Sequence, residues 1–141
     1  MVTRRSQNRI LLIQPPFYRL YKDSYSFRTY PLALGYLSGA IKKETNWHVM
    51  AYDADFNPKN ELMSVSYLTG AGFNNYLRNL RDSSGGLWDE IKSTISEFKP
   101  AVVGISVKSP TFASARLVAK LAKEIDKQII VIVGGRHPSI V

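Results

Sequence analysis

Four short apolar runs alternate with longer segments of helical periodicity, and this alternation predicts the fold. The runs are Arg9–Gln14, Trp47–Asp53, Ala101–Ser106 and Ile129–Val133. Each has the length of a strand and is bounded by turn-forming or polar residues. The last run is apolar at every position and ends in two glycines, a pattern typical of a parallel strand buried on both faces under helices.

Apolar residues at helical spacing predict helices between the runs. The segment Pro31–Lys43 begins with a proline suited to a first turn and ends in two lysines that complement the helix dipole. Leu87–Phe98 has one apolar stripe and stops before a proline. A third helix is expected to begin at Ser109, with Ser109 as N-cap and Pro110 in its first turn.

Two segments between the runs have weaker patterns. Phe17–Tyr30 is aromatic and basic, and we expect a loop there. Ala54–Gly86 is long for a structureless connection in a compact domain, so we expect a helix within it, around Met63–Arg81.

Strands that alternate with helices require parallel pairing and right-handed crossovers. We therefore predict a single α/β domain over residues 1–141, with a flavodoxin-like (Rossmann-like), doubly wound parallel sheet in the order 2-1-3-4. The usual fifth strand is absent, so we expect a fragment of a longer protein whose fourth strand is an edge open to pairing. The switch point predicts one ligand crevice, lined by Gln14–Phe17, Ser106–Thr111 and Gly134–Ser139.

Composition narrows the classes of function. The chain has no cysteine, which excludes disulfides, iron–sulfur ligation and thiol catalysis within it. There is no stretch long enough to span a membrane and no signal peptide, and we expect a cytoplasmic location. The net charge of +8 comes from scattered residues, which favours solvated faces over an acidic partner domain or nucleic acid.

Several common sites of α/β proteins are excluded by their motifs. Gln14-Pro15-Pro16-Phe17 stands where a dinucleotide site requires G-x-G-x-x-G, and neither a P-loop nor a nucleophile elbow occurs. The paired acids of a phosphoacceptor site are missing after the first strand. No histidine, cysteine and carboxylate cluster indicates a metal site.

The remaining polar candidates lie after the strands. The hydroxyls of Ser106, Ser109 and Thr111 can donate to phosphate, ribose or amide oxygens, and the last two can equally cap the helix. Asp53 and Asp55 either cap the next segment or bind a ligand hydroxyl.

The two histidines have different predicted places. His48 is expected on the surface. His137 is expected in the crevice, either as a hydrogen-bonded loop residue or as a ligand contact.

Five segments in this order resemble the N-terminal cobalamin-binding domain of radical S-adenosylmethionine enzymes, closest to the anaerobic magnesium-protoporphyrin ester cyclase and methyltransferase type. They are Ile10–Pro16, Tyr30–Leu37, Tyr52–Asp55, Phe98–Ser106 and Val133–Ser139. The resemblance implies a corrinoid gripped at the strand ends, with its nucleotide tail passing between the third and fourth strands. The cofactor-binding residues expected from it are Gln14, Pro15, Pro16, Ser106, Val107, Lys108, Ser109, Thr111, Gly134, Gly135, His137 and Pro138.

Better-known cobalamin modules place D-x-H-x-x-G after the first strand, and this chain has no such motif at Gln14–Arg19. The resemblance therefore implies a cobalamin without a histidine below cobalt, which would ease reduction of the metal. The C-x-x-x-C-x-x-C motif of the family is also missing here. The 4Fe–4S cluster and S-adenosylmethionine would belong to a C-terminal radical S-adenosylmethionine domain of the same parent chain, and this module would be non-catalytic alone.

Two other classes of function stay open at the level of sequence. One is a nucleotide- or flavin-using α/β enzyme, and the other is an interaction module that uses the basic surface. The substrate of a parent enzyme, the residue below the corrin, the occupancy of the cofactor and the oligomeric state do not follow from the sequence.

Overall fold

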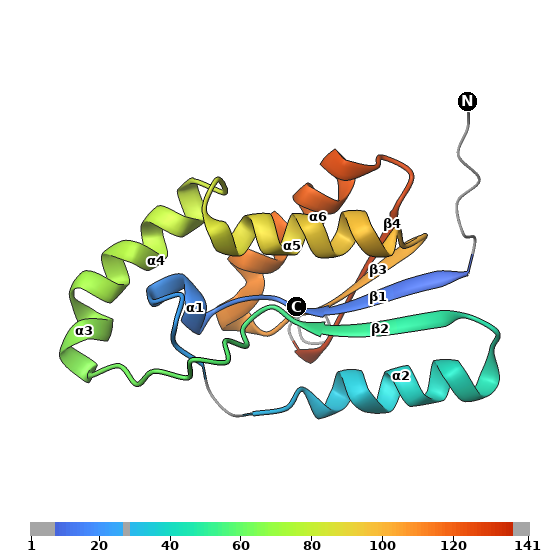
Figure 1. Cartoon of the computed structure of the whole chain (residues 1–141), viewed down its shortest axis with the longest axis horizontal. Coiled ribbons are helices and arrows are strands. Elements are labelled where there is room, and N and C mark those ends of the chain that lie inside the picture. Colours follow the sequence, from blue (N-terminus) through green and yellow to red (C-terminus); the bar gives the residue numbers. More distant parts are fainter. Residues whose placement is uncertain (1–7, 27–28, 137–141) are drawn as a thin grey trace.

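The computed structural model describes residues 8–26 and 29–136, and helices and strands alternate along them (Figure 1). The elements are β1 (Arg9–Gln14), α1 (Tyr18–Tyr21), α2 (Leu32–Glu44), β2 (His48–Asp53), α3 (Val65–Thr69), α4 (Ala71–Arg81), α5 (Gly86–Phe98), β3 (Val102–Ser106), a 3₁₀ turn (Ser109–Thr111), α6 (Phe112–Ile125) and β4 (Ile130–Gly134).

The four described strands form one parallel sheet in the order β2-β1-β3-β4. In the register, Leu11 lies opposite Met50 on one side and Val103 on the other. The order confirms the predicted doubly wound, flavodoxin-like sheet. All four carboxyl ends therefore point to the same edge of the sheet, with the switch point between β1 and β3.

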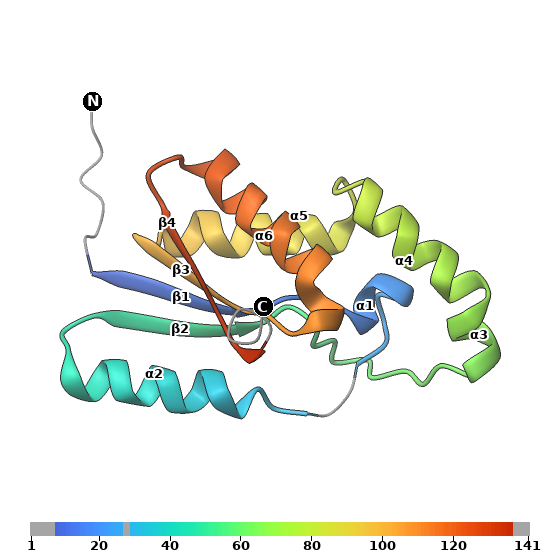
Figure 2. The ribbon, with the colours of Figure 1, turned by 180° about the vertical axis from the view of Figure 1, so that it is seen from behind.

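Helices pack on both faces of the sheet and beyond one of its edges. α5 and α6 cover one face and α2 covers β1 and β2 on the other, while α1, α3 and α4 lie past the carboxyl ends (Figures 1 and 2). The core lies mainly under α5 and α6, where Trp88, Ile91, Ile95 and Val118 are fully buried. The predicted stripe of Leu87–Phe98 is confirmed, and this side of the sheet holds the carboxyl ends in place.

Three local predictions differ from the structure. The expected Phe17–Tyr30 loop contains α1, whose rings pack against α4. The expected helix at Met63–Arg81 is divided at Gly70 into α3 and α4. The helix after β3 begins at Phe112, because Pro110 and its neighbours first form a 3₁₀ turn, so Ser109 is not its N-cap.

The prediction that the fourth strand is buried on both faces is wrong for the described chain. Ile130, Ile132 and Val133 of β4 are 58%, 53% and 52% exposed. Side chains alternate between the faces of a strand, and Val131 packs towards the core under α6. The face that carries Ile130 and Ile132 is open because the main strand contacts of α2 are with β1 and β2, whereas Val133 shares the face of Val131 and is exposed near the end of the strand. In the described residues, no helix is long and apolar enough to cross a membrane.

Because one face of β4 is open, an Ile→Thr substitution should cost less stability on β4 than on β3. Ile132→Thr keeps a β-branched side chain at a half-exposed position, so it should lower the free energy of unfolding by less than about 1 kcal/mol. Ile105 on β3 is only 2% exposed. Ile105→Thr should therefore cost about 2–4 kcal/mol, because it removes buried apolar surface and buries a hydroxyl. Urea unfolding of the cofactor-free protein measures both values, and equal costs would mean that another surface covers β4.

Candidate functional site

A crevice of about 340 Å³ lies at the carboxyl ends of the strands. Gln14 ends β1, Asp53 ends β2, and Lys108 and Thr111 follow β3. Phe17 and Tyr18 of the β1–α1 connection form an aromatic wall. This crevice joins the first, second and third strands at the switch point, as the topology predicts.

A second cavity lies on the open face of the sheet, between β1, β3, β4 and α2. This sheet-face groove has a volume of about 300 Å³, and its walls are mostly aliphatic. Ser106 and Gly134, which face each other in the β3–β4 register, line it together with Gly104. The single predicted crevice is thus two cavities, because Ser106 and Gly134 are still strand residues whereas Lys108 and Thr111 lie beyond the strand end.

The two glycines after the fourth apolar run have different roles. Gly135 has a φ of +107°, and a Cβ there would lie 2.7 Å from the Val107 carbonyl oxygen. Both facts exclude a side chain at this position. Gly134 accepts a 2.7 Å hydrogen bond from the Val107 N–H. A Cβ on Gly134 would meet no atom within 4 Å and would enter the groove. Gly135 therefore allows close backbone approach to Val107, and Gly134 leaves open space in the groove.

Several predicted site residues lie under the cavities. The side chains of Pro15, Pro16 and Val107 are buried, so they shape the backbone beneath the site. Ser109 is exposed at the start of the 3₁₀ turn. His137 and Pro138 lie outside the described residues.

The remaining predicted residues divide between the two cavities. Gln14, Lys108 and Thr111 line the crevice, while Ser106, Gly134 and Gly135 line the groove. The Thr111 hydroxyl accepts a hydrogen bond from the Lys108 N–H at 3.0 Å and so closes the 3₁₀ turn. His48 is exposed at the start of β2, as predicted, at the far end of the strand from the crevice.

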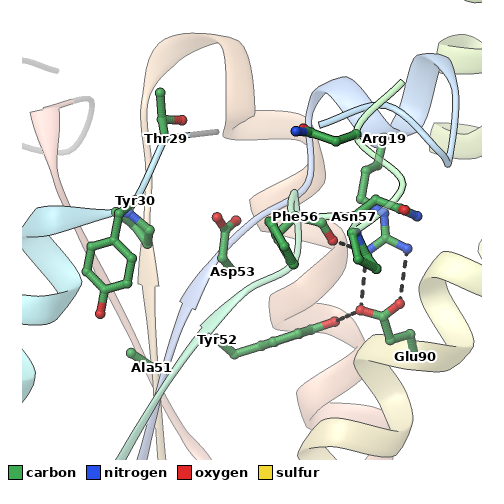
Figure 3. A pocket seen from close by; sticks show the side chains of 12 residues that line it. Arg19, Thr29, Tyr30, Ala51, Tyr52, Asp53, Phe56, Asn57 and Glu90 are labelled. Atoms are coloured by element: carbon green, nitrogen blue, oxygen red, sulfur yellow. Dashed lines mark hydrogen bonds and ion pairs between the residues drawn. The ribbon is translucent and has the colours of Figure 1, made fainter. Parts of the chain in front are cut away.

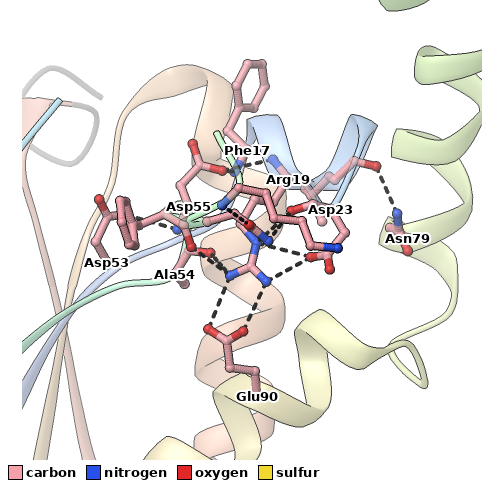
Figure 4. A network of polar contacts seen from close by, with 12 residues as sticks. Phe17, Arg19, Asp23, Asp53, Ala54, Asp55, Asn79 and Glu90 are labelled. Carbon is pink, nitrogen blue, oxygen red and sulfur yellow. Dashed lines mark hydrogen bonds and ion pairs between the residues drawn. The ribbon is translucent and has the colours of Figure 1, made fainter. Parts of the chain in front are cut away.

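A buried arginine fixes the elements around the crevice (Figure 4). Arg19 of α1 is 4% exposed, and its guanidinium forms ion pairs with Asp23 at 2.8 Å and with Glu90 of α5 at 3.0 Å. It also donates to the carbonyl oxygens of Ala54 and Phe56, each at 3.1 Å. One side chain therefore joins α1, the loop after β2 and α5.

Opposing effects set the ionisation of this ion-pair network. Burial alone would lower the pKa of Arg19, but hydrogen bonds and charge from Glu90 and Asp23 raise it overall. Burial alone would raise the pKa of Glu90, but hydrogen bonds from Arg19 and Tyr52 lower it overall. Burial, followed by the hydrogen bond to Glu90, raises the pKa of Tyr52 far above its ordinary value. The network is a carboxylate–guanidinium pair with a neutral phenol.

The two aspartates after β2 have separate places. Asp55 accepts hydrogen bonds from the backbone N–H groups of Phe17 and Arg19 at 2.8 and 3.0 Å, so it holds the start of α1. Asp53 accepts from the Asp55 N–H at 3.0 Å and lines the crevice. Burial is the main cause that raises the pKa of both carboxyls. Asp55 therefore holds α1, which precedes it in the sequence, and not the segment that follows β2 as predicted.

The predicted cofactor contacts left out eight lining residues of the crevice, although two of them, Phe17 and Pro110, lay within the segments predicted to line it. The eight are Phe17, Tyr18, Thr29, Tyr30, Pro31, Asp53, Asp55 and Pro110. The acidic pair after the second strand was the available signal for Asp53. Tyr30 is brought to the crevice by the tertiary position of α2, for which no local pattern exists.

Comparison with known families supports this geometry. A family model described as the B12 binding domain matches residues 18–141. The chain belongs to the B12-binding domain family. Neither the curated proteins nor the solved structures that were compared gave a match. The parallel sheet is therefore that of a B12-binding domain.

Removal of the arginine should destabilise the domain strongly. Arg19→Met removes the guanidinium that donates to three carbonyl oxygens and to the carboxylates of Asp23 and Glu90. It should lower the free energy of unfolding by about 2–3 kcal/mol, at the low end for a buried pair because Glu90 and Asp23 are partly exposed.

An exposed ion pair on α6 provides the control. Lys120→Met breaks the pair between Lys120 and Glu124. Exposed pairs contribute little, so this change should cost roughly 0.5 kcal/mol or less. Urea unfolding compares the two variants, and a similar small loss in both would contradict this role of Arg19.

Asp53 should lower stability at neutral pH. A carboxyl whose pKa is raised on folding favours the folded state below its unfolded pKa, near 3.8, and this stabilisation is lost as pH rises through the folded pKa. Asp53→Asn, which keeps an acceptor for Asp55, should therefore be more stable than the wild type at pH 7. The difference should shrink as the pH falls towards 4.

The exposed Asp89 on α5 provides the matched control. Asp89→Asn should show no such pH-dependent gain. Unfolding midpoints measured at several pH values decide the question. A wild type that exceeds Asp53→Asn in stability at pH 7 would contradict the burial cost of this carboxylate.

Proposed function

We propose that this B12-binding domain holds cobalamin with the nucleotide tail in the sheet-face groove and the corrin ring over the strand-end crevice. The observation that carries the proposal is the open position of Gly134 beside Ser106. There, a glycine keeps the floor of an aliphatic groove free at the end of the sheet. The family match and the resemblance of the strand-end segments support the same ligand.

The shape of the groove fits a flat apolar group with a polar attachment. Its volume of about 300 Å³ is at the lower end of the range for small-molecule sites. Gly104 keeps the floor low, since a Cβ there would lie 2.9 Å from the Leu12 side chain. These features suit a benzimidazole base held on its flat faces, with its ribose near the Ser106 hydroxyl.

The crevice offers donors and acceptors suited to the amide side chains of a corrin. Gln14 is polar and Lys108 is cationic, while Phe17 and Tyr18 give an aromatic surface. When bound, cobalamin supplies a cobalt centre that can carry a methyl group or exchange electrons. The residues of this chain bind and orient the cofactor, and the aromatic wall excludes water from its lower side.

We also infer a mode of binding without a histidine below cobalt. Phe17 and Tyr18 occupy the segment after β1 where better-known cobalamin modules carry the histidine, and His48 is at the opposite end of its strand. An aromatic lower face has no strong donor for the metal. The base, seated in the groove, would be separated from cobalt.

The parent protein that we propose is a radical S-adenosylmethionine methyltransferase or cyclase. The support is the resemblance of the five segments, and the C-terminal catalytic domain would carry the 4Fe–4S cluster and S-adenosylmethionine. The open face of β4 would suit a following strand and helix of the same chain. A three-cysteine cluster motif in the downstream coding sequence would support this parent, and a different downstream domain would exclude it.

The nucleotide groove predicts a preference between two corrinoids. The protein should retain hydroxocobalamin through gel filtration and should bind it at least about tenfold more tightly than cobinamide, which lacks the nucleotide tail. Gly134→Leu fills the groove and should remove this difference. Visible absorbance of the protein fraction measures retention. The spectrum of bound methylcobalamin should shift to shorter wavelength as the base leaves cobalt.

The control is Gly86→Leu at the start of α5, where a Cβ also meets no atom within 4 Å. This variant should retain cobalamin like the wild type. Equal binding of cobalamin and cobinamide by the wild type would contradict a tail groove. Retention of flavin mononucleotide in place of either corrinoid would favour the flavin-using alternative.

A further inference from the structure

A cavity of about 820 Å³ surrounds the outer edge of β2 (Figure 3). Its lining includes Ala51, Tyr52 and Asp53, three consecutive residues of this strand. Consecutive strand residues point to opposite faces of a sheet, so the cavity extends around the strand edge. It shares Thr29, Tyr30, Pro31 and Asp53 with the strand-end crevice and extends from there along β2 to Ala51 and Tyr52.

The walls of this β2-edge cavity are mainly apolar and partly aromatic. Tyr30 and Phe56 are 69% and 50% exposed, which leaves much of both rings accessible to a ligand. The Tyr30 ring lies over Gly35 of α2, where a Cβ would be 3.1 Å from the ring. The Tyr52 hydroxyl donates to Glu90, which fixes the third ring. A volume of this size is typical of small-molecule sites.

The charge of the cavity is opposite to that of the whole chain. Arg19 is its cation, and that guanidinium is already paired with Glu90 and Asp23. Once Arg19 and Glu90 are paired, the lining carries one further charge, the Asp53 carboxylate. It lies between the Tyr30 and Phe56 rings in Figure 3. Half-buried carboxylates attract cations and strong donors, and aromatic faces add a cation–π contribution. A positive ligand is favoured here although the chain carries +8.

We propose that the β2-edge cavity is a second binding site, which takes a planar, apolar-bodied organic cation paired with Asp53. The rings of Tyr30 and Phe56 contact the body of the ligand, and the carboxylate receives its cationic end. Because Tyr30 and Asp53 also line the strand-end crevice, a ligand in this cavity lies beside the proposed corrinoid.

Three small probes of nearly the same shape test the charge preference directly. Benzamidine is a flat aromatic cation, benzamide is its neutral analogue, and benzoate is the anion. Titration of the ¹⁵N-labelled full chain should show millimolar binding of benzamidine, with shifts at the amides of Ala51, Asp53 and Asn57. Benzamide should bind about fivefold more weakly, because it lacks the charge-assisted pair, and benzoate should leave these amides unchanged.

Two substitutions distinguish binding in the cavity from attraction by the net charge of the chain. Asp53→Asn should reduce benzamidine affinity about fivefold, to the level of benzamide. Asp89→Asn removes the same charge from the exposed side of α5 and should leave the affinity unchanged. If the positive net charge governed binding, benzoate would bind best, and this order would overturn the proposal. Benzamidine affinity that is equal in Asp53→Asn and the wild type, or shifts that map to another surface, would also overturn it.

The titration needs no cobalamin, so its outcome is independent of corrinoid binding. A chain that bound benzamidine but retained no cobalamin would contradict the proposed function and support this second site. The reverse result would contradict only the second site.

Discussion

The buried guanidinium of Arg19 is the contact on which the carboxyl end of the sheet depends. It comes from a helix of only four residues, α1, which could not persist alone. Its partners lie on the loop after β2 and on α5, and Asp55 holds the backbone at the start of the same helix. α4 adds a further support, since the Asn79 amide donates to the Leu20 carbonyl oxygen and the Trp88 indole donates to the Asn79 carbonyl oxygen. The aromatic wall of the crevice is therefore held in place by a buried, fully paired charge.

On the other side of the switch point, a backbone contact holds the strand ends together without a charged side chain. The Val107 N–H and the Gly134 carbonyl oxygen join β3 to β4, and Gly135 allows the chain to turn against Val107 with a positive φ. The Cα of the adjacent Gly134 has no such close neighbour and lies open to the groove. The two strand-end glycines thus have different consequences within one dipeptide, close backbone approach at Gly135 and open groove space at Gly134.

Much of the fold followed from the sequence because it depends on local patterns. The four strands, the order of the sheet and the α5 stripe are expressed in periodicity and in the alternation of elements, and the structure has them. The same apolar pattern in β4 led to a wrong prediction of burial on both faces, since composition does not say which neighbours are present. Arg19 gave no signal either: in an aromatic and basic segment it resembles a surface residue, and only tertiary contacts bury it. For the candidate site, hydroxyls and glycines marked the strand ends, but the division into two cavities depends on where β3 ends.

The placement of Asp53 is the clearest departure from an arrangement optimised for stability. Its carboxylate is half-buried at the end of β2, where burial disfavours the charge, whereas the neighbouring Asp55 has backbone donors and a structural duty. A neutral amide could satisfy the Asp55 N–H equally well. Carboxyl groups whose pKa values are perturbed by burial cluster at functional sites. Asp53 lies between the strand-end crevice and the β2-edge cavity, so its charge acts on both spaces. The same carboxylate that costs stability therefore gives the region between the two cavities a preference for cationic or donor groups.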